Sequence, residues 1–201
     1  MHTLLRLTLG SAVIMALVAC AAGYNPLDDY EQLTPVTLLV APPATGGNHP
    51  PEALERGQYL VALLGCGSCH TDGALIGEPN NARLLAGSGV GIAYSNPLAQ
   101  AHPGVVYPPN LTPDVATGIG NWTLEQIMAV VQSGTDRHGS QAVLPVMPWP
   151  AYANITDDDA RAIAMYLQSL TPVSHRVPVN VRPGQRAVAP FVHFGVYRSR
   201  P

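Results

Sequence analysis

The sequence predicts an all-α fold in which three main helices are joined by long, constrained loops. Three observations support this prediction. Apolar residues recur at helical spacing in three separate segments, and each segment has its own start and stop signals. Glycine (19) and proline (20) are abundant among the 201 residues, which indicates long loops between the segments. Only 6% of the residues are aromatic, so we expect little sheet.

The first helix is predicted within residues 51–64. It begins with Pro51 and acidic residues, which are favoured at helix N-termini because of the free backbone N–H groups and the helix dipole there. Its leucines recur at helical spacing, and Gly65 ends it.

Two further helices are predicted closer to the C-terminus. The second spans residues 124–133, where Thr123 can cap the N-terminus and a glycine follows the last residue. The third spans residues 157–170, with Thr156 as its cap, three aspartates in its first turn and a proline shortly after its end.

A single pentapeptide, Cys66 to His70, is the strongest chemical signal in the chain. In Cys-x-x-Cys-His, each cysteine can form a thioether to a haem vinyl group, and the histidine becomes an axial ligand of the iron. The sequence therefore predicts one covalent haem c, attached through Cys66 and Cys69 and ligated by His70. Residues 71–121, rich in glycine, proline and asparagine, can then pack against the haem without secondary structure of their own.

The second axial ligand of the iron is predicted to be Met147. It lies in residues 144–150, a loop that three prolines stiffen just before the last helix. A rigid loop suits a thioether that must meet the iron at a fixed distance. Met128 and Met165 fall within predicted helices, where methionine usually fills the core. Five histidines remain as rivals for the sixth position: His49, His102, His138, His175 and His193.

The remaining cysteine, Cys20, is explained by the N-terminus. An apolar run at residues 7–18 has about the length of a signal peptide, and Leu-Val-Ala-Cys resembles the bacterial lipobox. Residues 1–19 are therefore predicted to be a lipoprotein signal peptide, with Cys20 lipidated. An uncleaved membrane helix is the alternative, but this stretch is marginal for spanning. Covalent haem attachment takes place outside the cytoplasm, so we expect a lipid-anchored protein on the periplasmic side of a bacterial membrane.

The rest of the chain divides by composition. Residues 20–50 lack sustained periodicity and are predicted to be a flexible tether with a reach of roughly 30 Å. Residues 51–173 form the predicted haem domain, and residues 174–201 form a basic C-terminal extension. The extension has five arginines and no acidic residue, whereas residues 20–173 have a net charge of −9. Two alternatives follow for the extension. It either docks on the acidic domain or on an acidic partner, or it is a solvated, partly disordered end of the chain.

Several short motifs follow one another along the chain, and their order and spacing taken together are more specific than any single motif. They are Arg56-Gly57-x-Tyr59-Leu60, Gly65-Cys66-x-x-Cys69-His70-Thr71, Asn110-Leu111-Thr112-Pro113-Asp114, Thr117-Gly118-Ile119-Gly120-x-Trp122-Thr123, Pro145-x-Met147-Pro148, Tyr152-x-Asn154-Ile155-Thr156-Asp157 and Ala162-Ile163-x-x-Tyr166-Leu167-x-Ser169-Leu170. Together they resemble a class I c-type cytochrome domain, and more narrowly the cytochrome subunits of bacterial membrane-associated dehydrogenases.

The resemblance covers residues 52–173. It implies a small cytochrome c fold of three main helices and long loops wrapped around one covalently bound haem. The first and last helices would cross at Gly57 and Tyr166. It also implies thioethers at Cys66 and Cys69, with His70 and Met147 as iron ligands. Two segments depart from the family pattern: residues 93–104 look like an insertion, and residues 174–201 have no counterpart in a minimal domain.

The sequence therefore predicts one-electron transfer by a membrane-anchored monohaem cytochrome whose iron cycles between Fe(II) and Fe(III). Its partner would be a redox protein: a dehydrogenase, an oxidase or another cytochrome. With both axial positions filled, the protein would be a carrier and not an enzyme; a peroxidase-like haem enzyme is the alternative if the sixth ligand is labile. A thiol–disulfide pair or a zinc site at the two cysteines fits less well, because the pair follows a helix and a zinc ion would lack ligands. The net charge of −3 gives no indication of nucleic-acid binding.

Overall fold

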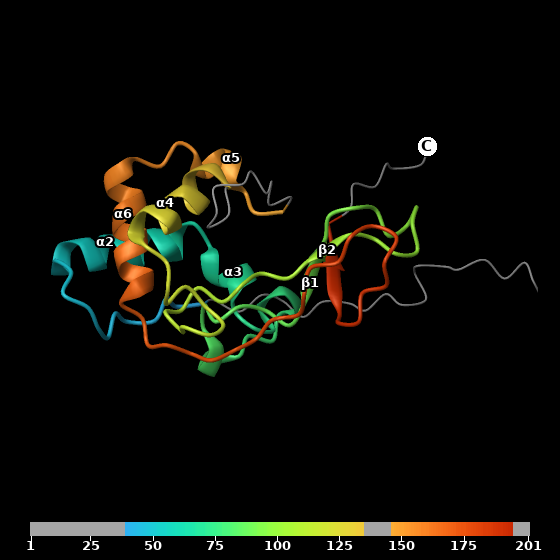
Figure 1. Cartoon of the computed structure of the whole chain (residues 1–201), viewed down its shortest axis with the longest axis horizontal. Coiled ribbons are helices and arrows are strands. Elements are labelled where there is room, and N and C mark those ends of the chain that lie inside the picture. Colours follow the sequence, from blue (N-terminus) through green and yellow to red (C-terminus); the bar gives the residue numbers. More distant parts are fainter. Residues whose placement is uncertain (1–38, 135–145, 195–201) are drawn as a thin grey trace, which may run out of the picture. The chain divides into compact units, whose positions relative to one another are not determined.

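The computed structural model of the chain describes residues 39–134 and 146–194. All of these residues belong to one compact unit. The larger helices lie together on one side of this unit, and a small sheet lies on the other (Figure 1). The helices are α2 (Pro51–Leu63), α3 (Cys66–His70), α4 (Leu124–Ser133), α5 (Trp149–Tyr152) and α6 (Asp157–Gln168), with two 3-10 turns at Ala74–Ile76 and Asn81–Arg83.

The helices α2, α4 and α6 occupy the three ranges that the sequence predicts. Their ends follow from local chemistry. The hydroxyl of Thr123 accepts the backbone N–H of Gln126, whose side chain in turn accepts the N–H of Thr123, so α4 begins with a complete capping box. Thr156 caps α6 in the same way, by accepting the N–H of Asp159.

The helices α2 and α6 cross at Gly57, as the cytochrome resemblance implies. A Cβ atom at Gly57 would lie 2.6 Å from the Cβ of Tyr166 and would overlap the carbonyl oxygen of Ala162. Tyr166 is fully buried, and its hydroxyl donates to the carbonyl of Pro42. The crossing is therefore so close that only glycine fits at this position of α2.

The main core lies between the long helices. Met128 is buried in it, as predicted, so it fills the core. The buried members of this core cluster are Leu60, Val61, Leu85, Ile119, Ile127, Met128, Ala160, Ile163, Ala164, Tyr166, Leu167 and Leu170.

A small sheet corrects the prediction of an all-α fold. Its strands are β1 (Gly91–Ala93), β2 (Val105–Val106) and β3 (Phe191–His193), in the order β2-β1-β3. β1 is antiparallel to β2 and parallel to β3. Two of these strands and both 3-10 turns lie in residues 71–121, so that segment also has more secondary structure than the sequence predicts. Each strand has only two or three residues, too few for a periodicity of two to be detectable.

The insertion and the C-terminal extension, the two departures from the family pattern, pack against each other. Within the insertion, the carbonyl of His102 accepts the backbone N–H of Gly184 at 2.8 Å. Just after the insertion, the backbones of Val105 and Val181 exchange two hydrogen bonds, and the hydroxyl of Tyr107 donates to the carbonyl of Ala189 at 2.9 Å. A third apolar cluster consists of Ala93, Val105 and Tyr107 with Val177, Val181, Ala187, Ala189 and Phe191. In the described part of the chain, none of the ion pairs involves an arginine of the extension. The described part of the extension is therefore docked through apolar contacts and hydrogen bonds, without an ion pair of its own arginines.

The described end of the predicted tether also contacts the domain. The backbone N–H groups of Thr45 and Gly46 both donate to the carbonyl of Ser169 at 2.9 Å, and the side chain of Gln58 donates to the carbonyl of Ala41. The earlier part of the tether, Cys20 and the predicted signal peptide lie outside the described residues. Within residues 39–134 and 146–194, no helix combines the length and the apolarity needed to cross a bilayer.

Candidate functional site

The short helix α3 brings three of the predicted site residues onto one face. Gly65, with φ +68°, adopts the left-handed conformation that lets the chain turn from α2 directly into α3. Cys66, Cys69 and His70 stand at positions i, i+3 and i+4 of a helix, which are neighbours on its surface. Cys66 packs against the main core cluster, whereas Cys69 packs against a second apolar cluster. The two cysteines of α3 therefore contact two different apolar clusters.

The ring of His70 is held by the backbone of another loop. Its Nδ1 atom lies 2.8 Å from the carbonyl oxygen of Pro109. A carbonyl can only accept a hydrogen bond, so Nδ1 carries the hydrogen and Nε2 is left as the atom with a free lone pair. This is the arrangement that metal-ligating histidines adopt. Burial lowers the pKa of His70 and the bond to Pro109 opposes this, so the ring favours the neutral form in which an imidazole binds iron.

A buried polar network fixes the position of the Pro109 carbonyl. Asn110 is 2% exposed and uses its whole amide: Oδ1 accepts from the N–H and hydroxyl of Thr112, and Nδ2 donates to Thr117 and to the carbonyl of Val173. This network attaches the segment after Pro109 to the chain that leaves α6. Asn110 belongs to one of the sequence motifs, but the role of Pro109 could not be predicted, because a backbone carbonyl that accepts a hydrogen bond requires no particular side chain.

The cysteines and His70 are also held from the next loop. The backbone N–H of Gly87 donates to the carbonyl of His70 at 2.8 Å, and the N–H of Leu85 donates to the hydroxyl of Thr71 at 3.1 Å. Thr71 is fully buried. The end of α3 is therefore fixed to this loop at two points, the backbone carbonyl of His70 and the side chain of Thr71.

Met147 lies in the described part of the chain, and its loop approaches the same apolar cluster as Cys69. Met147 is half-buried, and its neighbour Val146 packs against the second cluster. The hydroxyl of Tyr152 in α5 donates to the carbonyl of Leu64 at 2.9 Å, so the helix after Met147 is tied to the turn before α3. Pro145, the first flanking proline, lies outside the described residues.

The second apolar cluster is a part of the site that the sequence analysis missed. Its buried members are Val90, Ile92 and Val192, and the residues packed against them are Cys69, Leu75, Ile76, Val106 and Val146. The buried residues come from two segments about 100 positions apart, so no local periodicity could have indicated them. They form an apolar wall beside Cys69.

The chemistry of the thiols disfavours a dithiol redox pair. Cys66 and Cys69 are both free. Burial raises the pKa of Cys66 to about 11, and burial also raises the pKa of Cys69. Thiol–disulfide catalysts need the opposite shift, because the thiolate is the nucleophile. Among the described residues, no group of three or more histidine, cysteine and acidic side chains could hold a metal ion, so a zinc site at the two cysteines gains no further ligand there.

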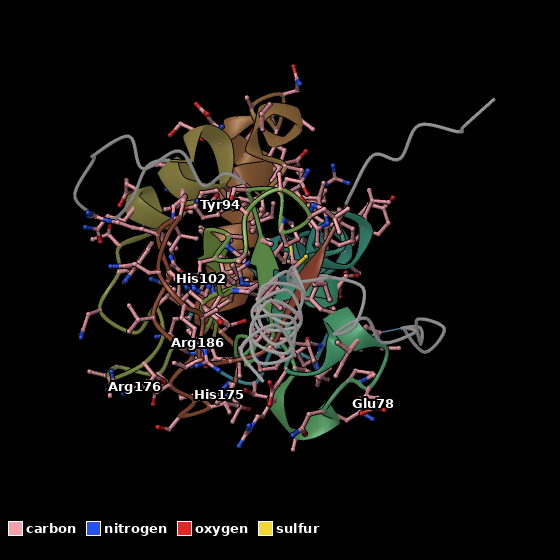
Figure 2. All side chains as sticks on the ribbon, turned by 90° about the vertical axis from the view of Figure 1, so that its right-hand side faces the viewer. Glu78, Tyr94, His102, His175, Arg176 and Arg186 are labelled. Atoms are coloured by element: carbon pink, nitrogen blue, oxygen red, sulfur yellow. The ribbon has the colours of Figure 1, made fainter. Side chains whose placement is uncertain are left out.

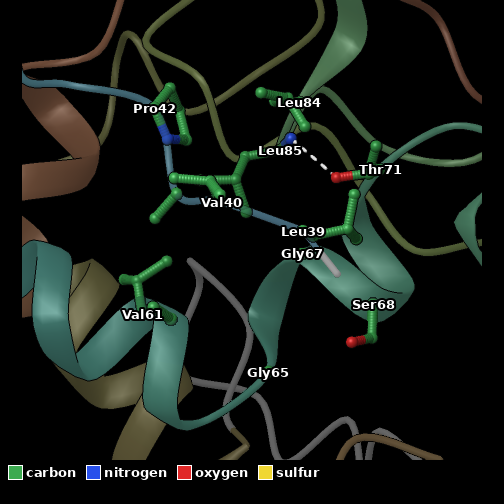
Figure 3. A pocket seen from close by; sticks show the side chains of 12 residues that line it. Leu39, Val40, Pro42, Val61, Gly65, Gly67, Ser68, Thr71, Leu84 and Leu85 are labelled. Carbon is green, nitrogen blue, oxygen red and sulfur yellow. Dashed lines mark hydrogen bonds between the residues drawn. The ribbon is translucent and has the colours of Figure 1, made fainter. Parts of the chain in front are cut away.

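A cavity of about 370 Å³ lies behind α3 and is separate from the site. Gly67 and Ser68 of α3 and Thr71 just after it line this cavity, and Leu39 to Pro42 line its other side (Figure 3). By helical spacing, Gly67 and Ser68 lie on the face of α3 opposite to Cys66 and Cys69. The hydrogen bond from Leu85 to Thr71 runs along its wall. This cavity contains none of the predicted haem residues.

Four of the histidines that rival Met147 as the second axial ligand lie in the described part of the chain. His175 is engaged at both ring nitrogens: Nδ1 lies 2.9 Å from the carbonyl of Ala86, and Nε2 lies 3.3 Å from Arg83. His102 is exposed, on the face shown in Figure 2, and its carbonyl accepts the backbone N–H of Gly184. His193 lies in β3, and His49 precedes α2. His138 lies outside the described residues.

Comparison with known proteins gives a family match and several relatives. The family model of cytochrome c matches residues 54–171. The chain is 33% identical over 159 residues to the fructose dehydrogenase cytochrome subunit of Gluconobacter japonicus, which is 79% of this chain and 27% of that protein. It is 37% identical over 122 residues to the cytochrome c subunit of a quinone alcohol dehydrogenase from Gluconobacter oxydans, which is 60% of this chain and 22% of that protein. The gluconate 2-dehydrogenase cytochrome c subunit of Pantoea cypripedii is 31% identical over 122 residues, or 60% of this chain and 24% of that protein. The chain thus spans about a quarter of the length of these relatives.

Proposed function

The chain belongs to the cytochrome c family, and from this membership we propose that it is a one-electron carrier with a single covalently bound haem c. The proposal of one haem rests on the single Cys-x-x-Cys-His motif of this chain. When bound, the haem supplies an iron that alternates between Fe(II) and Fe(III). The protein's own residues hold it, orient it and keep water away.

The observation that carries the proposal is the arrangement on α3. Cys66 and Cys69 would hold the haem through thioethers, and His70 would ligate the iron through Nε2. The carbonyl of Pro109 leaves that nitrogen free and fixes the plane of the ring. The two apolar clusters beside the cysteines would cover the faces of the haem and exclude water.

Met147 is proposed as the second axial ligand. Support comes from the stiff loop in which it lies and from Val146, which packs against the same cluster as Cys69. Ligation by histidine and methionine raises the reduction potential of a haem relative to two nitrogen ligands. It also leaves no open coordination position for oxygen or peroxide. Residues 145–150, the loop that carries Met147, contain no acid–base side chain of the kind that peroxide chemistry requires, which favours a carrier over a haem enzyme.

The location and the partner are proposed from the sequence and from the relatives. We propose that residues 1–19 are a signal peptide, that Cys20 is lipidated, and that residues 20–50 link the lipid to the haem domain at the periplasmic side of a membrane. The relatives are named as cytochrome subunits of dehydrogenases. We propose accordingly that this chain exchanges electrons with a dehydrogenase, with an oxidase or another cytochrome as the further candidates.

A spectroscopic experiment tests the function. The exported full chain should give a reduced-minus-oxidised spectrum of a c-type haem, and the haem should remain attached after denaturation in detergent. The double variant Cys66→Ser, Cys69→Ser should lose the covalent haem, whereas the matched control Ser68→Ala, on the other face of α3, should keep it. A wild-type chain without covalent haem would refute the proposal.

A further inference from the structure

We propose that the C-terminal strand β3 forms one wall of the haem site, with Val192 as the residue that faces the haem. This inference rests on the proposed attachment of haem to Cys66 and Cys69. It goes further because it assigns to the cofactor site a strand that lies outside the cytochrome c match, which ends at residue 171. The haem site of this chain would then be completed by its C-terminal extension.

The first argument is the apolar cluster that Val192 shares with the site. Val192 is 9% exposed and belongs to the apolar cluster against which both Cys69 and Val146 pack. Cys69 is a proposed thioether residue, and Val146 precedes the proposed ligand Met147. The cluster that contains Val192 is therefore also in contact with both chain segments that would hold the haem.

The second argument is the alternation of side chains along β3. Ile92 of β1 is the register partner of Val192, and both belong to the second cluster. The neighbouring residue Phe191 points to the other face of the sheet, where it packs with Ala93 and Tyr107 in the third cluster. Among the three residues of β3, Val192 is thus the one that belongs to the cluster against which Cys69 packs.

The third argument is the way in which the extension is fastened. The backbone N–H of Gly91 donates to the carbonyl of Pro190 at 2.9 Å, immediately before β3. Further upstream in the extension, the side-chain oxygen of Asn180 accepts the backbone N–H of Tyr107 at 2.8 Å. Together with the bond from the Tyr107 hydroxyl to Ala189, these contacts fix β3 against β1. The strand is held as part of the fold, so its side chain is in a defined position.

An apolar wall has a measurable effect on a haem. Burial in apolar surroundings disfavours the more highly charged ferric state and raises the reduction potential. Val192→Thr keeps the shape of the side chain and adds one hydroxyl to the wall. We expect it to shift the equilibrium between the two iron states toward Fe(III) by about threefold to tenfold, where tenfold is about 59 mV for one electron.

The experiment compares midpoint potentials in the full-length holoprotein. The matched control is Val188→Thr, the same substitution at a residue of the extension that is 94% exposed, and it should leave the potential unchanged. Val192→Ile, which keeps the wall apolar, should stay close to the wild type. A Val192→Thr potential equal to that of the control would overturn the inference.

A second measurement separates this inference from the proposed function. The covalent haem content of each purified full-length chain is measured before its potential. A wild type that carries no covalent haem would refute the proposed function. If the wild type, Val192→Thr and Val188→Thr each carry one haem and all have the same potential, the proposed function holds and the inference about Val192 alone is overturned.

Discussion

Replacing Gly57 with alanine should destabilise the domain, although the same change usually stabilises a helix. In a helix interior, alanine is favoured over glycine by about 0.5–1 kcal/mol. At Gly57, however, the new Cβ would overlap the carbonyl of Ala162 and lie 2.6 Å from the Cβ of Tyr166. Neither atom can rotate away, so α2 and α6 would have to separate. Overpacking of this kind costs about 3 kcal/mol or more, which leaves a net loss of about 2 kcal/mol.

The assay is urea unfolding of the holoprotein, followed by the absorbance of the haem and by circular dichroism. With a slope of about 2 kcal/mol/M, the midpoint of Gly57→Ala should fall by about 1 M at an unchanged slope. Gly67→Ala is the matched control, because Gly67 also lies in a helix but its nearest neighbour to a new Cβ is at an ordinary 3.6 Å. The reasoning is wrong if Gly57→Ala unfolds at the same urea concentration as Gly67→Ala.

Three further predictions concern the site and its supports. Met147→Ala should open a coordination position, so that the reduced protein binds carbon monoxide and its potential falls; an unchanged spectrum would exclude Met147 as the ligand. Asn110→Leu should cost about 2–4 kcal/mol in urea unfolding, because several buried hydrogen-bonding groups lose their partner, and a loss below about 1 kcal/mol would contradict the role of the network. Burial raises the pKa of Asp72, but hydrogen bonds from Gly89 and Arg83 lower it overall, so its stabilising effect is present at neutral pH and is lost as the pH falls below about 4. Asp72→Asn should therefore cost about 1–2 kcal/mol at pH 7 and much less near pH 3, and a cost that does not depend on pH would refute this account.

The helices could be predicted from the sequence because their signals are local. Thr123 and Gln126 form a capping box within four residues, and Thr156 caps α6 through the N–H three residues ahead. The close approach at Gly57 was also expected, since a glycine in a helix beside a large aromatic residue of another helix is part of the family pattern. The capping signals are contained in short stretches of chain, whereas the crossing of Gly57 and Tyr166 was expected from the family pattern.

The sheet and the apolar wall could not be predicted, because they depend on contacts between distant residues. β1 and β3 are each three residues long and lie about 100 residues apart, so neither has a pattern that identifies it alone. The carbonyl of Pro109 was missed for another reason: every residue has a carbonyl, and only the fold decides which one meets His70. The roles of Cys66, Cys69 and Met147 stay predictions that the variants at these positions test, and the role of His70 as an iron ligand stays a prediction as well.

The attachment of residues 39–47 to the domain determines how a mechanical load would enter it. Thr45 and Gly46 are bonded to Ser169 at the end of α6, and Tyr166 is bonded to Pro42. Tension applied from the N-terminal side therefore enters α2 through the bond between Ala41 and Gln58, and enters α6 through Pro42 and Ser169. No backbone hydrogen bond among the described residues joins this segment directly to Cys66–His70. A load on this segment would thus be shared by two packed helices, and not carried by α3 alone.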